Sequence, residues 1–115
     1  MNAPAEERGI LQRLAASLVD RGVDAAYQEW TRGRSTYRCV ALNGRGRRDN
    51  DDAVWHYATG EPLAGERLAR AVLVWGHRFE HRVAAEPTQA AAEAIAAQAL
   101  ARAAELRRQE RGGAR

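Results

Sequence analysis

The chain lacks lysine, contains a single cysteine, Cys39, and has no long run of apolar residues. A single cysteine excludes an internal disulfide framework. The absence of about 18 consecutive apolar residues excludes a transmembrane helix. All 18 basic residues are arginine. Together with the abundance of alanine, this bias is typical of coding in a GC-rich bacterial genome, or in a phage or plasmid of such a host.

The sequence also lacks the motifs that mark common catalytic and nucleotide-binding folds. It contains no G-x-S-x-G elbow, no P-loop and no Rossmann glycine pattern, and no pair of carboxylates stands out for acid–base chemistry. The first residues, MNAPAEERG, have no cationic flank followed by an apolar core, which a secretory signal requires. We therefore expect a non-enzymatic, cytoplasmic protein that uses no cofactor and does not contact a membrane.

The N-terminal part of the chain predicts a helix over residues 5–21. Its apolar residues recur at helical spacing and form one stripe. They are Ile10, Leu11, Leu14, Ala15 and Leu18. Gly22 follows where a left-handed C-terminal cap is expected.

Residues 23–44 predict a β-hairpin, because they are rich in aromatic and β-branched residues and are bounded by glycines. Gly33-Arg34 suits a type II′ turn, which requires glycine at its first position. The resulting cross-strand pairs are Trp30 with Tyr37, Gln28 with Cys39, Glu29 with Arg38, and Tyr27 with Val40. An aromatic pair on one face and an opposite-charge pair on the other are favourable neighbours. The pattern does not decide which face is buried.

The rest of the chain predicts a polar loop (44–52), a third short strand (53–60) and two helices. The second helix begins at Glu61 and Pro62 and ends before Pro87. Its apolar residues, spaced by three and four, form the stripe that we expect to face the core: Leu68, Val72, Trp75, Phe79 and Val83. An alanine-rich third helix runs from Thr88 to about Arg111, and a frayed tail follows it.

These elements predict an α+β fold with an N-terminal helix, a two- or three-stranded antiparallel sheet and two C-terminal helices. Residues 1–86 form the compact α+β domain. Residues 87–115, the alanine-rich helix and its tail, either belong to the same domain or dock on a partner.

Charge is segregated along the chain. The first 31 residues have five acidic side chains against three arginines, whereas residues 32–48 contain six arginines and no acid. These are Arg32, Arg34, Arg38, Arg45, Arg47 and Arg48. A guanidinium group binds two phosphate oxygens at once, and Trp30 and Tyr37 supply ring faces on which bases stack. We therefore predict contact with nucleic acid or another polyanion; alternatively, the arginines solvate the hairpin tip and neutralise Asp49, Asp51 and Asp52.

The second interpretation is a protein-interaction module or inhibitor that uses the hairpin or the third helix. The third helix has a heptad-like seam made of alanines with few large residues: Ala92, Ala96, Ala99, Ala103 and Leu106. Small side chains let helices approach closely, so this seam suits a second copy of the chain or another protein. An ordinary packed C-terminal helix explains the same pattern.

The third interpretation is a small zinc-binding protein. The stretch GHRFEH places His77 and His81 four residues apart, a spacing at which two rings on one helix reach the same ion. We reject the inverted zinc-peptidase motif, because that family needs a distant glutamate ligand and only an alanine-rich helix follows His81. His56 is a candidate third ligand, but two histidines at helical spacing are a weak signal, and we expect no metal site.

Two further features have plain structural explanations. The DNDD stretch (49–52) lacks the glycine and glutamate of a calcium-binding loop and predicts a solvated acidic turn. A lone cysteine within a strand, Cys39, predicts a small buried apolar side chain.

Overall fold

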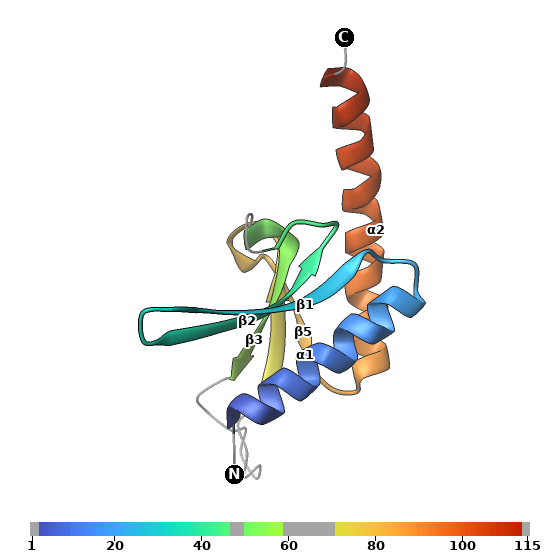
Figure 1. Cartoon of the computed structure of the whole chain (residues 1–115). Coiled ribbons are helices and arrows are strands. Elements are labelled where there is room, and N and C mark those ends of the chain that lie inside the picture. Colours follow the sequence, from blue (N-terminus) through green and yellow to red (C-terminus); the bar gives the residue numbers. More distant parts are fainter. Residues whose placement is uncertain (1–2, 47–49, 59–70, 114–115) are drawn as a thin grey trace.

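The computed structural model describes residues 3–46, 50–58 and 71–113 (Figure 1). The chain begins with helix α1 (Ala3–Asp20), followed by strands β1 (Ala25–Arg32) and β2 (Ser35–Leu42). A short 3-10 turn, η1 (Asn50–Asp52), leads into β3 (Ala53–Ala58). Strands β4 (Ala71–Trp75) and β5 (His81–Ala84) flank a second 3-10 turn, η2 (His77–Phe79), and helix α2 (Thr88–Gly113) follows. The strands form one antiparallel sheet in chain order.

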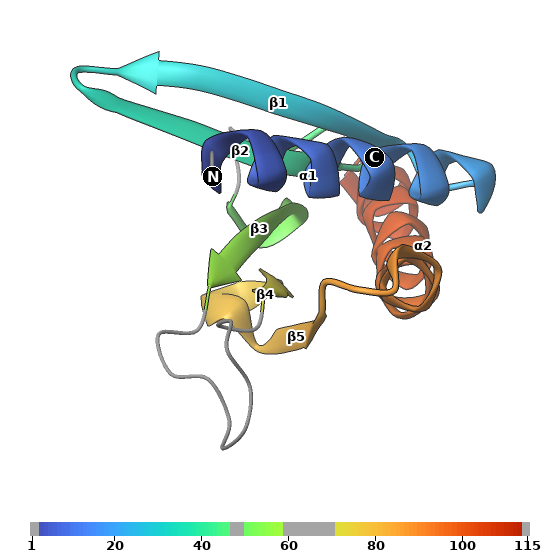
Figure 2. The same ribbon diagram turned by 90° about the horizontal axis from the view of Figure 1, so that it is seen from below.

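The two helices lie on the same face of the sheet and contact each other (Figure 2). Leu11, Leu14 and Leu18 of α1 are fully buried there, as is Ile95 of α2. Side chains from one face of the strands complete this core: Val40, Leu42, Val54, Leu73 and Trp75. We call the opposite face of the sheet the outer face. The α+β class predicted from the sequence is confirmed.

Helix α1 ends as the sequence predicts. Gly22 has a positive φ of 83°, which glycine adopts without steric strain. The Val23 N–H donates to the Leu18 carbonyl and the Gly22 N–H donates to the Val19 carbonyl, each at 3.0 Å. These two bonds form a Schellman motif, and buried Val23 then leads the chain into β1.

The hairpin of β1 and β2 has the predicted register throughout, including Trp30 opposite Tyr37 and Glu29 opposite Arg38. Gly33 has a φ of 62°, and Arg34 is not among the residues with positive φ, which is the pattern of a type II′ turn. The distal end of the hairpin extends beyond the helices (Figures 1 and 2). The predicted third strand is also present, as β3.

The predicted second helix is wrong within the described residues, where strands β4 and β5 replace it; Glu61, Pro62 and Leu68 lie outside them. Trp75 is buried as expected, but Phe79 is 50% exposed. A short apolar run such as AVLVW fits a buried strand as well as a helix. Here Leu73 and Trp75 face the core while Val74, also buried, faces the outer side. Gly76, Arg78 and Phe79 all have positive φ, so the chain reverses where a helix would continue.

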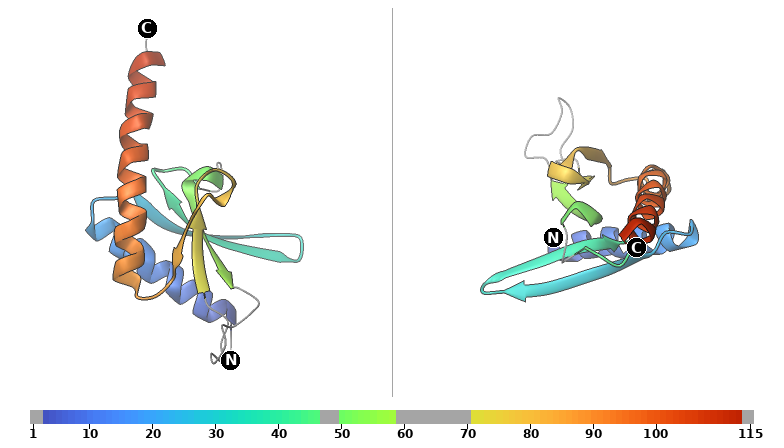
Figure 3. Two further views of the ribbon diagram at one scale, coloured as in Figure 1. Left: turned by 180° about the vertical axis from the view of Figure 1, so that it is seen from behind. Right: turned by 90° about the horizontal axis from the view of Figure 1, so that it is seen from above.

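Helix α2 is therefore the single C-terminal helix of the described chain, and the sheet has five strands rather than two or three. The first half of α2 contributes Ala92, Ala96 and Ala99 of the predicted seam to the core. Its second half projects away from the sheet (Figures 1 and 3). The helix continues through Gly113, slightly beyond the predicted end near Arg111.

No helix in the described ranges is both long and apolar enough to span a membrane.

Candidate nucleic-acid interface

An aromatic cluster occupies the outer face of the sheet at the hairpin. The rings of Trp30 and Tyr37 stack, with centroids 5.7 Å apart and planes inclined by 24°. Trp55 meets Trp30 edge-on, with centroids 5.9 Å apart. Tyr37 is 40% exposed, and the two tryptophans are half-buried. The fold thus decides what the sequence left open: the face carrying Trp30 and Tyr37 points away from the helices.

Sequence reasoning missed Trp55 as a member of this cluster. Strand β3 pairs with β2 through Val54 opposite Val40 and Ala53 opposite Ala41. Because side chains alternate between the faces of a strand, Trp55 lies on the outer face, as do Trp30 and Tyr37. The sequence feature that could have revealed it is the predicted third strand, because the register of this strand with β2 determines the face of the sheet on which Trp55 lies.

The hairpin tip is basic. Arg32 and Arg34 are exposed, and neither forms an ion pair with any residue of the described part of the chain. No acidic residue lies between Glu29 and the described end of this segment at Gly46. The tip therefore presents two guanidinium groups beside the aromatic cluster without a local counter-charge.

Arg38 belongs to a different set of contacts, on the helix-facing side of the hairpin. Its Nε lies 3.0 Å from Glu29 Oε1, and its side chain is only 13% exposed. Arg8 of α1 reaches the same oxygen at 3.0 Å, and the Tyr27 hydroxyl donates to it at 2.6 Å. These hydrogen bonds, that of Tyr27 first, lower the pKa of Glu29 to about 2. Glu29 thus links the hairpin to α1 through Arg8, whereas Arg38 pairs with Glu29 across the two strands and does not point to the outer face.

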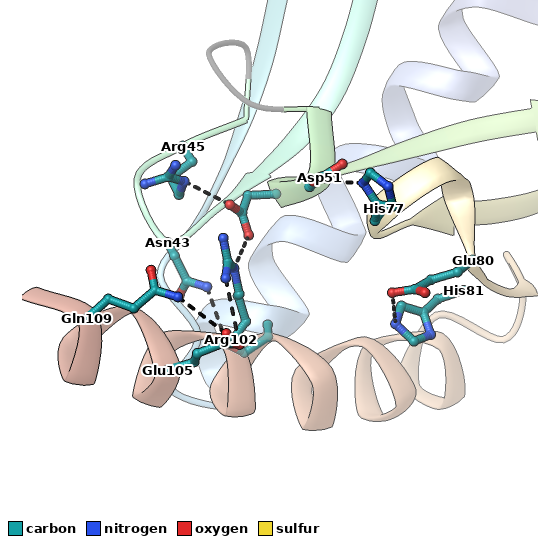
Figure 4. Close-up of polar contacts among 11 residues, drawn as sticks. Asn43, Arg45, Asp51, His77, Glu80, His81, Arg102, Glu105 and Gln109 are labelled. Carbon is teal, nitrogen blue, oxygen red and sulfur yellow. Dashed lines mark hydrogen bonds and ion pairs between the residues drawn. The ribbon is translucent and has the colours of Figure 1, made fainter.

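Arg45 also has an acidic partner (Figure 4). Its Nε lies 2.8 Å from Asp52 Oδ2, an ion pair without good hydrogen-bond angles. Arg102 of α2 donates from Nε to Asp52 Oδ1 at 3.3 Å. The Asp52 side chain is 3% exposed, so the prediction of a solvated acidic turn is wrong for this residue. Arg47, Arg48 and Asp49 lie outside the described residues.

A cleft of about 450 Å³ opens between η1, η2 and α2. Its charged side chains are largely paired with one another. His77 Nδ1 lies 3.3 Å from Asp51 Oδ2, His81 Nε2 lies 3.4 Å from Glu80 Oε1, and Arg102 Nη1 lies 3.7 Å from an oxygen of Glu105. Figure 4 shows these pairs along α2. Four carboxylates, two arginines and the two histidines thus line the cleft.

The histidines do not share a helix, because His77 lies in η2 and His81 begins β5. His56 is on β3, where its Nδ1 lies 3.8 Å from Glu7 Oε2 of α1. Within the described residues, no three histidine, cysteine or carboxylate side chains are grouped so as to hold a metal ion.

Cys39 is fully buried, as the sequence predicts. Its thiol lies 3.9 Å from the Gln28 side-chain oxygen. Burial raises the pKa of the thiol to about 11. Since the thiolate is the reactive form, Cys39 is poorly suited to act as a nucleophile near neutral pH.

No family model, curated protein or solved structure matches this chain. Its function must therefore be inferred from the groups that the fold brings together. At the distal hairpin these are the stacked pair of Trp30 and Tyr37, the neighbouring Trp55, and the tip arginines Arg32 and Arg34. We call these five residues the hairpin site.

Proposed function

We propose that this protein is a small non-enzymatic binding protein that contacts single-stranded nucleic acid through the hairpin site. The observation that carries the proposal is the combination of a partly exposed aromatic stack with two arginines that have no ion pair among the described residues. Proteins that bind single strands combine aromatic side chains, on which bases stack, with a basic surface that follows the phosphate backbone.

The shape of the hairpin supports a single strand as the ligand. Tyr37, at 40% exposure, offers a ring face for a base that is not already stacked within a duplex. Arg32 and Arg34 lie beyond the aromatic pair toward the turn, so a strand stacked on Tyr37 would bring neighbouring phosphates to the guanidinium groups. Arg38 and Arg45 take part in internal ion pairs, and we assign them a structural role.

A protein partner is the second candidate, and the projecting half of α2 favours it. Leu100 is 44% exposed. Together with Ala103 and Leu106 it lines a groove of about 560 Å³ beside the turns that follow α1 and β2. An exposed leucine within a groove rimmed by polar and charged side chains suits a helix or loop of another protein.

The experiment that separates the two candidates is a binding titration with labelled single-stranded oligonucleotides of DNA and of RNA, at several salt concentrations. The test variant is Arg32→Ala/Arg34→Ala. Loss of two phosphate contacts should reduce the slope of log K against log salt by about 1.4, at about 0.7 per contact. Tyr37→Ala should weaken binding about 5- to 150-fold, since one stacked base contributes about 1–3 kcal/mol.

The matched control is Arg107→Ala/Arg108→Ala, which removes the same charge from two exposed, adjacent arginines of α2. This control should bind oligonucleotides nearly as well as the wild type. Equal weakening by the two double variants would mean that net charge alone drives binding, and would refute the hairpin site. Absence of binding by the wild type at low salt would also refute it and would favour the protein partner.

A further inference from the structure

Strand β1 is an edge of the sheet, and no described residue pairs with its outer side. Views from below and from above both show β1 at the margin of the sheet, with no other element on its outer side (Figures 2 and 3). The strand has eight residues and contains no proline. Unpaired edges of this length are templates for another strand, and proteins usually shorten, cover or interrupt them.

The register of the hairpin identifies the backbone groups that point outward. A two-residue turn makes Arg32 and Ser35 a hydrogen-bonded pair. Hydrogen-bonded and non-hydrogen-bonded pairs then alternate along an antiparallel ladder. The N–H and C=O groups of Ala25, Tyr27, Glu29 and Thr31 therefore face away from β2. They form a continuous row of donors and acceptors at the edge.

We propose that β1 pairs with β1 of a second copy of this chain, antiparallel, about a two-fold axis at Gln28. This register places Ala25 opposite Thr31 of the other copy, and Tyr27 opposite Glu29. It uses every outward backbone group of the strand, giving four hydrogen-bonded pairs and thus about eight hydrogen bonds. The contact extends the two sheets into one and is distinct from a dimer through α2.

Charge complementarity favours this register over its neighbours. Asp24 directly precedes β1, and its carbonyl accepts a hydrogen bond from the Asn43 N–H at 2.8 Å, so the extended chain continues through it. In the proposed register Asp24 lies opposite Arg32 of the other copy at both ends of the contact. Arg32 is exposed and has no ion pair among the described residues. A shift by two residues in one direction would instead place Glu29 opposite Glu29, and like charges directly opposite are unfavourable.

The inference does not depend on the proposed function, because the dimer forms without nucleic acid. In the dimer Arg32 faces Asp24 of the other copy, so Arg34 and the aromatic cluster are the groups left there for nucleic acid, whereas the monomer offers both arginines. The outer faces of both copies would form one surface with two hairpin tips at opposite ends. Failure of nucleic-acid binding would therefore not refute the dimer, and failure of dimerisation would not refute nucleic-acid binding.

The test is sedimentation analysis of the full chain across a dilution series, in the absence of nucleic acid. We expect the wild type to approach twice the chain mass of 12.7 kDa. Thr31→Pro removes an outward N–H at β1 without removing a bond to β2. Because symmetry removes two hydrogen bonds, at about fivefold each, the dissociation constant of the dimer should rise by about 25-fold or more.

Thr36→Pro is the matched control. Thr36 is the cross-strand partner of Thr31 and is also exposed. Its N–H points to the other side of the hairpin, where the described β2–β3 pairs are only those of Val40 and Ala41. This variant should retain the dimer. A wild type that stays monomeric, or equal dimer loss in both proline variants, would overturn the proposal.

A charge exchange tests the register, and it keeps the proposal testable even if the proline variants do not fold. Asp24→Arg alone, or Arg32→Asp alone, would place like charges opposite each other and weaken the dimer. The combined Asp24→Arg/Arg32→Asp variant restores opposite charges and should dimerise about as well as the wild type. If the combined variant is as weak as the single ones, the proposed pairing is wrong.

Discussion

Asp52 provides the sharpest test of the packing between α2 and the sheet. Its buried carboxylate forms ion pairs with Arg45, which follows β2, and with Arg102 on α2. The burial of the three side chains is unequal: Asp52 is 3% exposed, Arg102 33% and Arg45 41%. Removing the acid and removing the bases should therefore have different consequences.

The double variant Arg45→Ala/Arg102→Ala leaves a carboxylate in the interior without a cation, which costs about 3–5 kcal/mol. Asp52→Ala leaves two guanidinium groups that water already reaches, so we expect a loss of only about 1–2 kcal/mol. The difference of about 2 kcal/mol corresponds to roughly 8 °C in melting temperature, at about 4 °C per kcal/mol for a domain of this size. Removing the acid should thus be the milder change.

Thermal and urea unfolding followed by circular dichroism measures both losses. The triple variant Asp52→Ala/Arg45→Ala/Arg102→Ala is the informative control, because it contains no buried charge at this position. It should be more stable than the double arginine variant and close to Asp52→Ala. If Asp52→Ala is as unstable as the double arginine variant, the burial of Asp52 does not control the energetics and our reasoning fails.

Two further predictions concern stability. Trp75→Ala should lower the free energy of urea unfolding by about 3–5 kcal/mol, because Trp75 is 5% exposed in the core. Phe79→Ala should change this free energy little, because Phe79 is 50% exposed. A larger loss for Phe79→Ala than for Trp75→Ala would contradict this structure of η2. The folded-state pKa of Glu29 is about 2, below the value of about 4.3 in an unfolded chain. Its contribution is therefore complete above about pH 5 and is lost as the pH falls toward 2. Melting temperatures measured from pH 7 to pH 2 should fall more steeply for the wild type than for Glu29→Gln, and parallel curves would disprove the role of Glu29.

Local patterns in the sequence were sufficient where neighbouring residues determine the conformation. The stripe of α1 and the cap at Gly22 follow from helical spacing and from glycine's freedom at positive φ. The hairpin register follows from the turn at Gly33, because a two-residue turn fixes every pair of the two strands. The function assigned to this hairpin remains a proposal.

Tertiary structure decided what depends on contacts between distant residues. The run from Ala71 to Trp75 fits two periodicities, and only pairing with β3 and β5 makes it a strand buried on both faces. The sequence alone does not distinguish the arginines of this segment. In the fold, Arg38 and Arg45 form ion pairs with Glu29 and Asp52, whereas Arg32 and Arg34 are exposed at the hairpin tip. Which face of the hairpin lies against the helices was decided by tertiary packing, because a strand alternates its side chains but does not determine which face a helix covers.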